Sequence, residues 1–158
     1  MTMGTEIEYK FLVIGDAWRK GARKILIRQG YLNKDKERTV RVRAFDNMGF
    51  LTVKGPSRGG VRAEFEYEIP FSDALEILDN LAEKPLIEKV RHIVQVNNYT
   101  WEIDEFMGAN KGLIVAEIEL SRPDQDFFLP HWVGKNVSDD PRYLNSNLAK
   151  TPYSNWKE

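Results

Sequence analysis

The segment Glu6-Ile7-Glu8-Tyr9-Lys10 places charged and apolar side chains at alternate positions near the start of the 158-residue chain. Because successive side chains of a β-strand point to opposite faces, its glutamates and lysine share one face and its apolar residues share the other. A sheet with one buried and one solvated face produces the same alternation, and for a single strand that is the better interpretation. The segment becomes informative only if the pattern recurs.

The alternation does recur along the chain, and the charges are segregated by sign. The like-charged sets are Glu6 and Glu8; Arg41 and Arg43; Glu64, Glu66 and Glu68; Lys89 and Arg91; and Glu117 and Glu119. A solvated face usually mixes its signs, because neighbouring like charges repel. Segregated signs favour opposing groups of the other sign, so the charged faces are predicted to point toward a shared interior.

Eight segments are predicted to be strands, because they are rich in β-branched and aromatic residues with a period of two. They are Thr5–Leu12, Ile25–Leu32, Arg38–Phe45, Phe50–Lys54, Arg62–Ile69, Glu88–Val96, Tyr99–Phe106 and Leu113–Leu120. The Asn, Gly and Pro residues of Asp46–Gly49, Gly55–Gly60 and Asn97–Asn98 predict tight turns between them. Neighbouring strands are therefore expected to pair as antiparallel hairpins.

The segment Ser72–Glu83 predicts a helix, since it begins with an N-cap residue and has apolar residues at helical spacing. Further short helices are expected over Asp16–Lys24, Asp124–Phe128 and Arg142–Lys150. A closed barrel leaves room for side chains or a small ligand, and helices can cover its outer face. We therefore expect an α+β fold with a closed eight-stranded antiparallel β-barrel, a charged interior and helices packed on the outside, in a single domain over residues 1–158.

The composition excludes several classes of function. The net charge is −1, so no overall positive field attracts nucleic acid. The chain has no cysteine, which excludes disulfides and a thiolate nucleophile. The apolar runs are too short to span a membrane and the first residues lack a secretory signal, so a cytoplasmic location is expected. His92 is interpreted as a packing or surface residue and His131 as a loop residue.

A charged barrel interior needs partners for its charges. Buried carboxylates and guanidiniums are costly unless they are paired, hydrated or bound to a ligand and a metal. Carboxylate oxygens suit Mg²⁺ or Mn²⁺, and arginine and lysine suit phosphate oxygens. The sequence therefore predicts a wet tunnel that holds a polyanion together with a divalent cation.

An ordered set of charged positions resembles the CYTH family, the triphosphate tunnel metalloenzymes. The set is Glu6-x-Glu8-x-Lys10, Arg41-x-Arg43, Lys54, Arg62-x-Glu64-x-Glu66, Lys89-x-Arg91, Asp104 and Glu117-x-Glu119. The segment Asp140–Ala149 also resembles the closing segment of small bacterial members. Position 9 is often arginine in such proteins and is tyrosine here, on the face that points away from the tunnel.

The resemblance implies a role for each of these positions. The implied metal-binding residues are Glu6, Glu8, Glu64, Glu66, Asp104, Glu117 and Glu119. The implied substrate-binding residues are Lys10, Arg41, Arg43, Lys54, Arg62, Lys89 and Arg91. The implied catalytic residues are Glu6, Glu8, Lys10, Glu117 and Glu119. Glu68 and Glu102 fit the charged face but receive no role.

The implied activity is the hydrolysis of inorganic triphosphate to pyrophosphate and phosphate, by water that Mg²⁺ or Mn²⁺ activates inside the tunnel. Related tunnels leave nucleoside or thiamine triphosphatase and adenylate cyclase open, and a non-catalytic polyphosphate-binding module is the alternative from another class. The chain has no obvious base-recognition insert, which favours the bare triphosphate. The expected partner is a small-molecule triphosphate rather than nucleic acid or a membrane, and a homodimer is compatible with the sequence.

Overall fold

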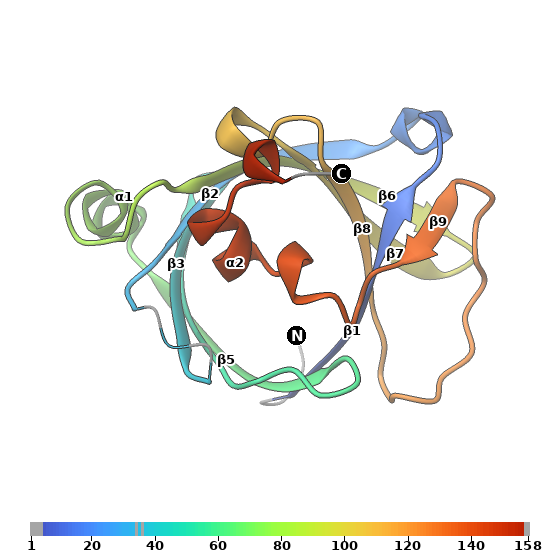
Figure 1. The fold of residues 1–158 in the computed structure, drawn as a ribbon, viewed down its shortest axis with the longest axis horizontal. Helices are drawn as coiled ribbons and strands as arrows, with labels where there is room; N and C mark the ends of the chain where they lie inside the picture. The colour runs from blue at the N-terminus through green and yellow to red at the C-terminus, as the bar shows by residue number, and fades with distance from the viewer. Residues whose placement is uncertain (1–4, 34, 36, 157–158) are drawn as a thin grey trace.

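The computed structural model describes residues 5–33, 35 and 37–156, and its centre is a ring of antiparallel strands (Figure 1). The strands follow the order β5-β4-β3-β2-β6-β7-β8-β1, and a pairing between β1 and β5 closes the ring. They are β1 (Thr5–Val13), β2 (Arg23–Tyr31), β3 (Thr39–Phe45), β4 (Met48–Lys54), β5 (Val61–Ile69), β6 (Ile87–Val96), β7 (Tyr99–Phe106) and β8 (Ile114–Glu119). The predicted barrel of eight antiparallel strands is confirmed.

Strand β1 closes the barrel because it pairs with three strands along its length. Its first residues pair with β5, where Glu6 lies opposite Arg62, and its middle residues pair with β8, where Lys10 lies opposite Glu117. Its last residues pair with β9 (Val133–Asn136), which lies outside the ring. The sequence does not predict β9, because four residues that include a glycine carry too little alternation.

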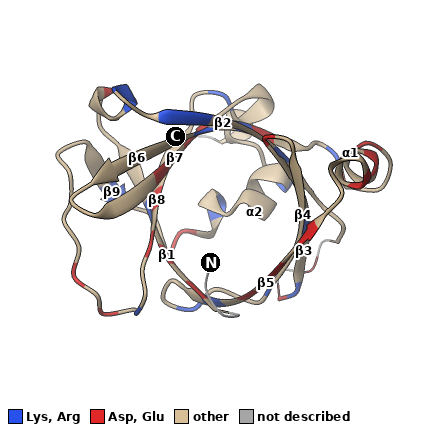
Figure 2. Ribbon diagram, turned by 180° about the vertical axis from the view of Figure 1, so that it is seen from behind, with Lys and Arg blue, Asp and Glu red and all other residues tan. Residues whose placement is uncertain are grey.

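The strand register directs the charged positions inward. Residues paired across neighbouring strands share a face, so Glu6 and Arg62 point to the same side of the sheet. Figure 2 shows acidic and basic positions on strands around the ring. The intervening residues of β1 point outward, where Ile7 and Phe11 join a buried cluster with Trp101. The predicted charged interior and apolar exterior are therefore observed.

Two hairpin turns have the backbone conformations that their sequences predict. Asn97 and Asn98, between β6 and β7, both have positive φ, 49° and 68°. Asp46, between β3 and β4, has φ 59°. Asparagine and aspartate tolerate this left-handed region better than most other residues with a side chain. These turns connect sequential strands directly, which keeps their pairing antiparallel.

Helix α1 (Phe71–Asn80) packs on the outer face of the barrel, as predicted. Its buried residues Ala74 and Leu78 form an apolar cluster with Val42 of β3. The helix approaches β4 so closely that a Cβ at Gly49 would lie 2.8 Å from the Cβ of Ala74. Glycine is required at this contact because a larger residue would push the helix away from the sheet.

The C-terminal segment lies at one end of the barrel rather than on its side. It contains a 3₁₀ turn (Pro141–Tyr143) and helix α2 (Asn145–Lys150). Tyr143 and Leu148 are buried in an apolar cluster with Tyr31, an inward-facing residue of β2. Views from opposite sides both show α2 inside the outline of the ring (Figures 1 and 2). The segment therefore lies across part of this end, where residues 144–146 line the cavity. The predicted helix Arg142–Lys150 is divided into two elements because Leu144 is extended.

Two other expected helices differ in the structure. The segment Asp16–Lys24 contains only the 3₁₀ turn Ala17–Arg19, because Gly21 adopts φ +74° and the chain then enters β2. The predicted helix Asp124–Phe128 is wrong, since this segment forms an irregular loop. Its backbone is held by tertiary contacts, including a 2.9 Å hydrogen bond from the Tyr99 hydroxyl to the Asp126 carbonyl oxygen. No helix among the described residues has the length and apolar character needed to cross a membrane.

Candidate active site

The barrel interior contains a cavity of about 730 Å³ that is lined by charged side chains. All the site residues predicted from the sequence reach this cavity, with the exception of Asp104. They are Glu6, Glu8, Lys10, Arg41, Arg43, Lys54, Arg62, Glu64, Glu66, Lys89, Arg91, Glu117 and Glu119. Residues from distant parts of the chain meet here because each strand turns its charged face inward.

Lys54 joins two carboxylates on one wall of the cavity. Its Nζ lies 3.0 Å from Glu6 Oε2 and 3.2 Å from Glu64 Oε2. The barrel register creates this group, because Lys54 lies opposite Glu64, and Glu6 lies opposite Arg62 on the next strand pair. Burial opposes the charge of Glu64, but the Lys54 ammonium holds the pKa of that carboxyl below its usual range. Glu64 is therefore ionised, and its carboxylate is directed toward the Lys54 ammonium.

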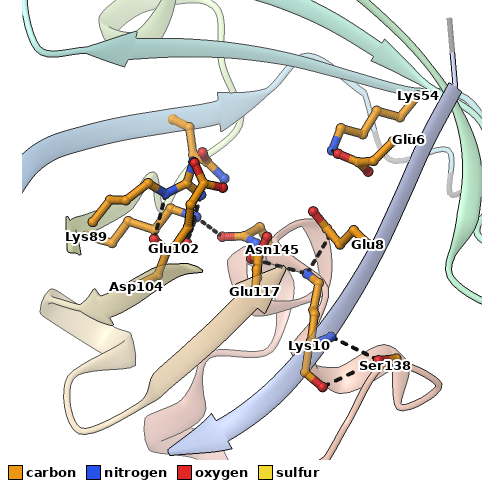
Figure 3. A network of polar contacts seen from close by, with 12 residues as sticks. Glu6, Glu8, Lys10, Lys54, Lys89, Glu102, Asp104, Glu117, Ser138 and Asn145 are labelled. Atoms are coloured by element: carbon orange, nitrogen blue, oxygen red, sulfur yellow. Dashed lines mark hydrogen bonds and ion pairs between the residues drawn. The ribbon is translucent and has the colours of Figure 1, made fainter. Parts of the chain in front are cut away.

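Lys10 lies between two further carboxylates (Figure 3). Its Nζ is 3.8 Å from both Glu8 Oε1 and Glu117 Oε1. Burial disfavours the charge of Lys10, but Glu117 and Glu8 raise its pKa. Burial and the charge of Glu8 raise the pKa of Glu117, while burial and Glu6 raise the pKa of Glu119 to about 7. Carboxylates that repel one another in this way favour an added cation.

Asp104 lies behind the cavity wall, where it is paired with two cations. Its Oδ2 is 2.7 Å from Lys89 Nζ, and its Oδ1 accepts a 2.8 Å hydrogen bond from Arg91 Nε. Burial opposes the charge of Asp104, but Arg91 and Lys89 hold its pKa well below the usual range. Burial lowers the pKa of Lys89 to about 7. The structure therefore makes Asp104 a counter-ion for Lys89 and Arg91.

Arg41 and Arg43 form a basic wall with a free donor. The Nη2 atom of Arg41 is 3.3 Å from Thr52 Oγ1 and 3.6 Å from Glu66 Oε2, whereas its Nε is buried without a hydrogen-bond partner among the described residues. The Nε of Arg43 donates to Gln29 Oε1 at 2.8 Å. Burial, together with Arg41, lowers the pKa of Arg43 to about 9. Clustered cations with an unsatisfied donor are suited to an anionic ligand.

The acidic residues provide the donor chemistry that a divalent cation needs. Glu6, Glu8 and Glu119 offer hard carboxylate oxygens on the cavity surface, which suit Mg²⁺ or Mn²⁺. Over residues 5–33, 35 and 37–156, however, no three His, Asp or Glu side chains gather closely enough to hold a metal ion. Lys10 and Lys54 lie among these carboxylates instead. The donors fit a divalent cation, and the assignment of individual ligands stays a prediction.

Several cavity residues lie outside the predicted set. Glu102 Oε2 is 3.4 Å from Arg91 Nη1, and Glu102 could have been included because it follows the alternation of its strand. Tyr31 also lines the cavity, but the sequence of β2 does not predict a charged inner face, because the inward-facing positions of this strand include the apolar Ile27. Asn145 comes from the C-terminal segment, which no strand periodicity places near the tunnel.

Comparison with known proteins agrees with this geometry. The chain matches the CYTH domain over residues 4–152. It is 56% identical over 156 residues to an inorganic triphosphatase of Acetivibrio thermocellus, an alignment that covers 99% of this chain and 100% of the relative. It is 34% identical over 151 residues to an inorganic triphosphatase of Nitrosomonas europaea, covering 92% and 97%.

A solved structure shares the same architecture. A crystal structure of an inorganic triphosphatase superposes with a TM-score of 0.66 at 30% sequence identity, covering 91% of this chain and 97% of that one. The family match extends over all the strands that carry the charged interior. The chain therefore belongs to the CYTH domain family.

Proposed function

We propose that this protein hydrolyses inorganic triphosphate to pyrophosphate and phosphate with the help of a divalent cation. The observation that carries the proposal is the cavity, in which a basic wall with an unsatisfied guanidinium donor faces a set of carboxylates. A short polyanion with a bound cation complements both walls at once. The relatives named inorganic triphosphatases support this substrate, because one of them aligns with 99% of the chain at 56% identity.

The basic residues of the cavity bind the phosphate chain in this proposal. Arginine meets phosphate oxygens through paired N–H donors, and lysine meets them as a point charge. The residues proposed for this role are Lys10, Arg41, Arg43, Lys54, Arg62, Lys89 and Arg91. Their charges stabilise the negative charge that gathers on the leaving pyrophosphate.

The carboxylates that reach the cavity hold the cation in this proposal. Glu6, Glu8, Glu117 and Glu119 are the main candidates, and Glu64 and Glu66 support them. When bound, Mg²⁺ or Mn²⁺ neutralises phosphate charge and lowers the pKa of the attacking water. We assign Asp104 to the positioning of Lys89 and Arg91, because its carboxylate is already paired with both of them.

The proposed reaction needs only a small-molecule partner. The charged residues face the barrel interior, and the net charge of −1 provides no general attraction for nucleic acid. The absence of cysteine is compatible with the reducing cytoplasm, which we propose as the compartment.

A side-by-side assay tests the substrate. Triphosphate, ATP and thiamine triphosphate would be compared at equal concentrations with Mg²⁺ and with Mn²⁺, and the release of phosphate and of cyclic AMP would be measured. We expect the highest kcat/KM for triphosphate, no cyclic AMP, and loss of turnover after chelation of the metal. Equal rates on the three substrates would overturn the substrate assignment, and tight binding of triphosphate without hydrolysis would indicate a binding module.

A further inference from the structure

The C-terminal segment brings polar side chains to the closed end of the cavity. Tyr143 and Leu148 hold this segment in place, since both are buried in the apolar cluster at that end. Between them, Leu144, Asn145 and Ser146 line the cavity. A substrate that enters the tunnel therefore meets this segment at its inner end.

Asn145 has a defined orientation at this end (Figure 3). Its Oδ1 accepts a 3.0 Å hydrogen bond from Lys89 Nζ, and Lys89 is itself 2.7 Å from Asp104. An ammonium group can only donate, so the amide of Asn145 must turn its oxygen toward Lys89. The amide nitrogen, which carries two N–H donors, then points in another direction. Lys89 thus fixes a neutral donor group beside a cation at the wall of the cavity.

We propose that the Asn145 amide binds the free terminal phosphate of the substrate, next to Lys89. The inference rests on the proposed triphosphatase function and adds a specificity-determining residue to it. An amide nitrogen donates to a phosphate oxygen without adding a charge that would need its own counter-ion. Because Tyr143 and Leu148 are buried in an apolar cluster behind the segment, we infer that this end accepts an unsubstituted phosphate and excludes one that carries an ester group.

Two substitutions at one position separate substrate binding from a purely structural role. Asn145→Ala removes both the donor and the acceptor, whereas Asn145→Asp keeps an acceptor for Lys89 and removes the donor. If the amide binds phosphate, both variants raise the KM for triphosphate by about tenfold or more, the loss expected for a hydrogen bond to a charged group. If Asn145 only positions Lys89, Asn145→Asp retains the wild-type KM, and that result would overturn the proposal.

Matched controls exclude effects of added charge and of altered folding. Ser146→Asp adds the same charge at the neighbouring cavity position, and an increase in KM as large as that of Asn145→Asp would overturn a specific role for the amide. Asn147→Ser changes an asparagine of the same helix whose Nδ2 donates to the Pro141 carbonyl oxygen, so its KM should stay unchanged. Thermal unfolding of each variant would verify that the fold is retained.

A substrate with both ends esterified tests the closed end directly. Diadenosine triphosphate has no free terminal phosphate, and we expect it not to compete with triphosphate for the wild-type enzyme. Competition at concentrations near the KM for triphosphate would overturn recognition of the free end. The wild-type assay tests the proposed function by itself, because a wild-type protein that does not hydrolyse triphosphate disproves that function. The variants and the esterified compound then test only the role of Asn145 and of the free terminal phosphate.

Discussion

Two groups of ion pairs in the barrel differ in how open they are to the cavity. Lys10 is 3.8 Å from each of its carboxylate partners, Glu8 and Glu117, and all three line the cavity. Lys89, in contrast, is 2.7 Å from Asp104, and its side chain is only 1% exposed. A loose pair at a wet surface can exchange its partners for a metal and a phosphate, whereas a sealed pair cannot separate without leaving a buried charge. The first group is suited to exchanging its partners for ligands, whereas in the second Asp104 holds in place two cations, Lys89 and Arg91, that also line the cavity.

The largest effect is expected when the sealed group is broken. Asp104→Asn removes the buried carboxylate that pairs with both Lys89 and Arg91, so the free energy of unfolding should fall by about 3–5 kcal/mol. Urea unfolding would measure this loss. Glu102→Gln is the matched control, because Glu102 pairs with the same arginine while its side chain is 38% exposed, and about 1 kcal/mol or less is expected. Equal losses in the two variants would remove the distinction between sealed and open pairs.

The open group should respond in activity rather than in stability. Glu117→Gln keeps the shape of the side chain but removes its charge, and we expect kcat at saturating metal to fall by about 10²–10³-fold. Steady-state kinetics of triphosphate hydrolysis would measure the change, with thermal unfolding as a test of the fold. Glu68→Gln is the comparison, since Glu68 shares the charged face of β5 but is not among the cavity-lining residues, and its kcat should stay unchanged. Full activity of the Glu117 variant would contradict a role in binding the cation.

The open carboxylates should also make activity depend on pH near neutrality. Burial and neighbouring carboxylates raise the pKa of Glu119 to about 7 from its ordinary 4.5, so this group becomes ionised, and able to bind a cation, as the pH rises through 7. At limiting Mg²⁺ the rate should therefore increase between about pH 6 and 8. Glu119→Gln should flatten this part of the profile. An unchanged profile in the variant would show that another group controls the titration.

The same shift predicts the direction of a stability change. Because the pKa of Glu119 is higher in the folded protein than in the unfolded chain, the folded state binds its proton more tightly. This contribution to stability is fully present below about pH 4.5 and is lost as the pH rises through about 7. Thermal unfolding without metal should show this decline, and Mg²⁺ should offset it above pH 7 if the ion binds the folded state. In Glu119→Gln the decline should be smaller.

The smallest effect is expected outside the barrel. Arg19 forms two hydrogen bonds, 2.9 and 3.0 Å long, with Glu105, and both side chains are well exposed. Arg19→Ala should lower the free energy of unfolding by about 1 kcal/mol or less and should not alter triphosphate hydrolysis. Chemical unfolding and the standard activity assay would measure both properties. A large loss of activity would mean that the outer surface influences the tunnel. That result would contradict the view that only the ion pairs inside the barrel control activity.

Much of the fold follows from alternation and turn chemistry. Each predicted strand overlaps an observed one, because inward and outward positions differ so strongly in polarity that the period of two is clear. The local pattern of Asp124–Phe128 predicts a helix, but the segment is an irregular loop whose structure depends on tertiary contacts such as the hydrogen bond from Tyr99. The sequence does not predict the short strand β9, because its structure depends on pairing with β1.

The candidate site shows the same division. Membership of Glu6, Lys10 and Arg41 in one charged interior could be predicted from their spacing, and the cavity contains all three. The depth at which Asp104 is buried could not be predicted from the sequence, because Asp104 follows the same alternation as the cavity residues. Its burial depends on its contacts with Lys89 and Arg91. Charged residues that follow the same alternation, such as Glu6 and Asp104, can therefore have different roles.

The amino-acid sequence alone is sufficient to predict which side chains face inward, because the direction of a side chain on a strand is a local property that repeats every two residues. The tertiary structure alone decided which charges pair, how deeply each pair is buried and which segment closes the tunnel. These properties depend on the register between strands that are distant in the chain, as between Glu6 and Arg62, and on the packing of a C-terminal segment that carries Asn145 to Lys89. Local periodicity contains no information about such distances, so the site becomes specific only when the barrel closes.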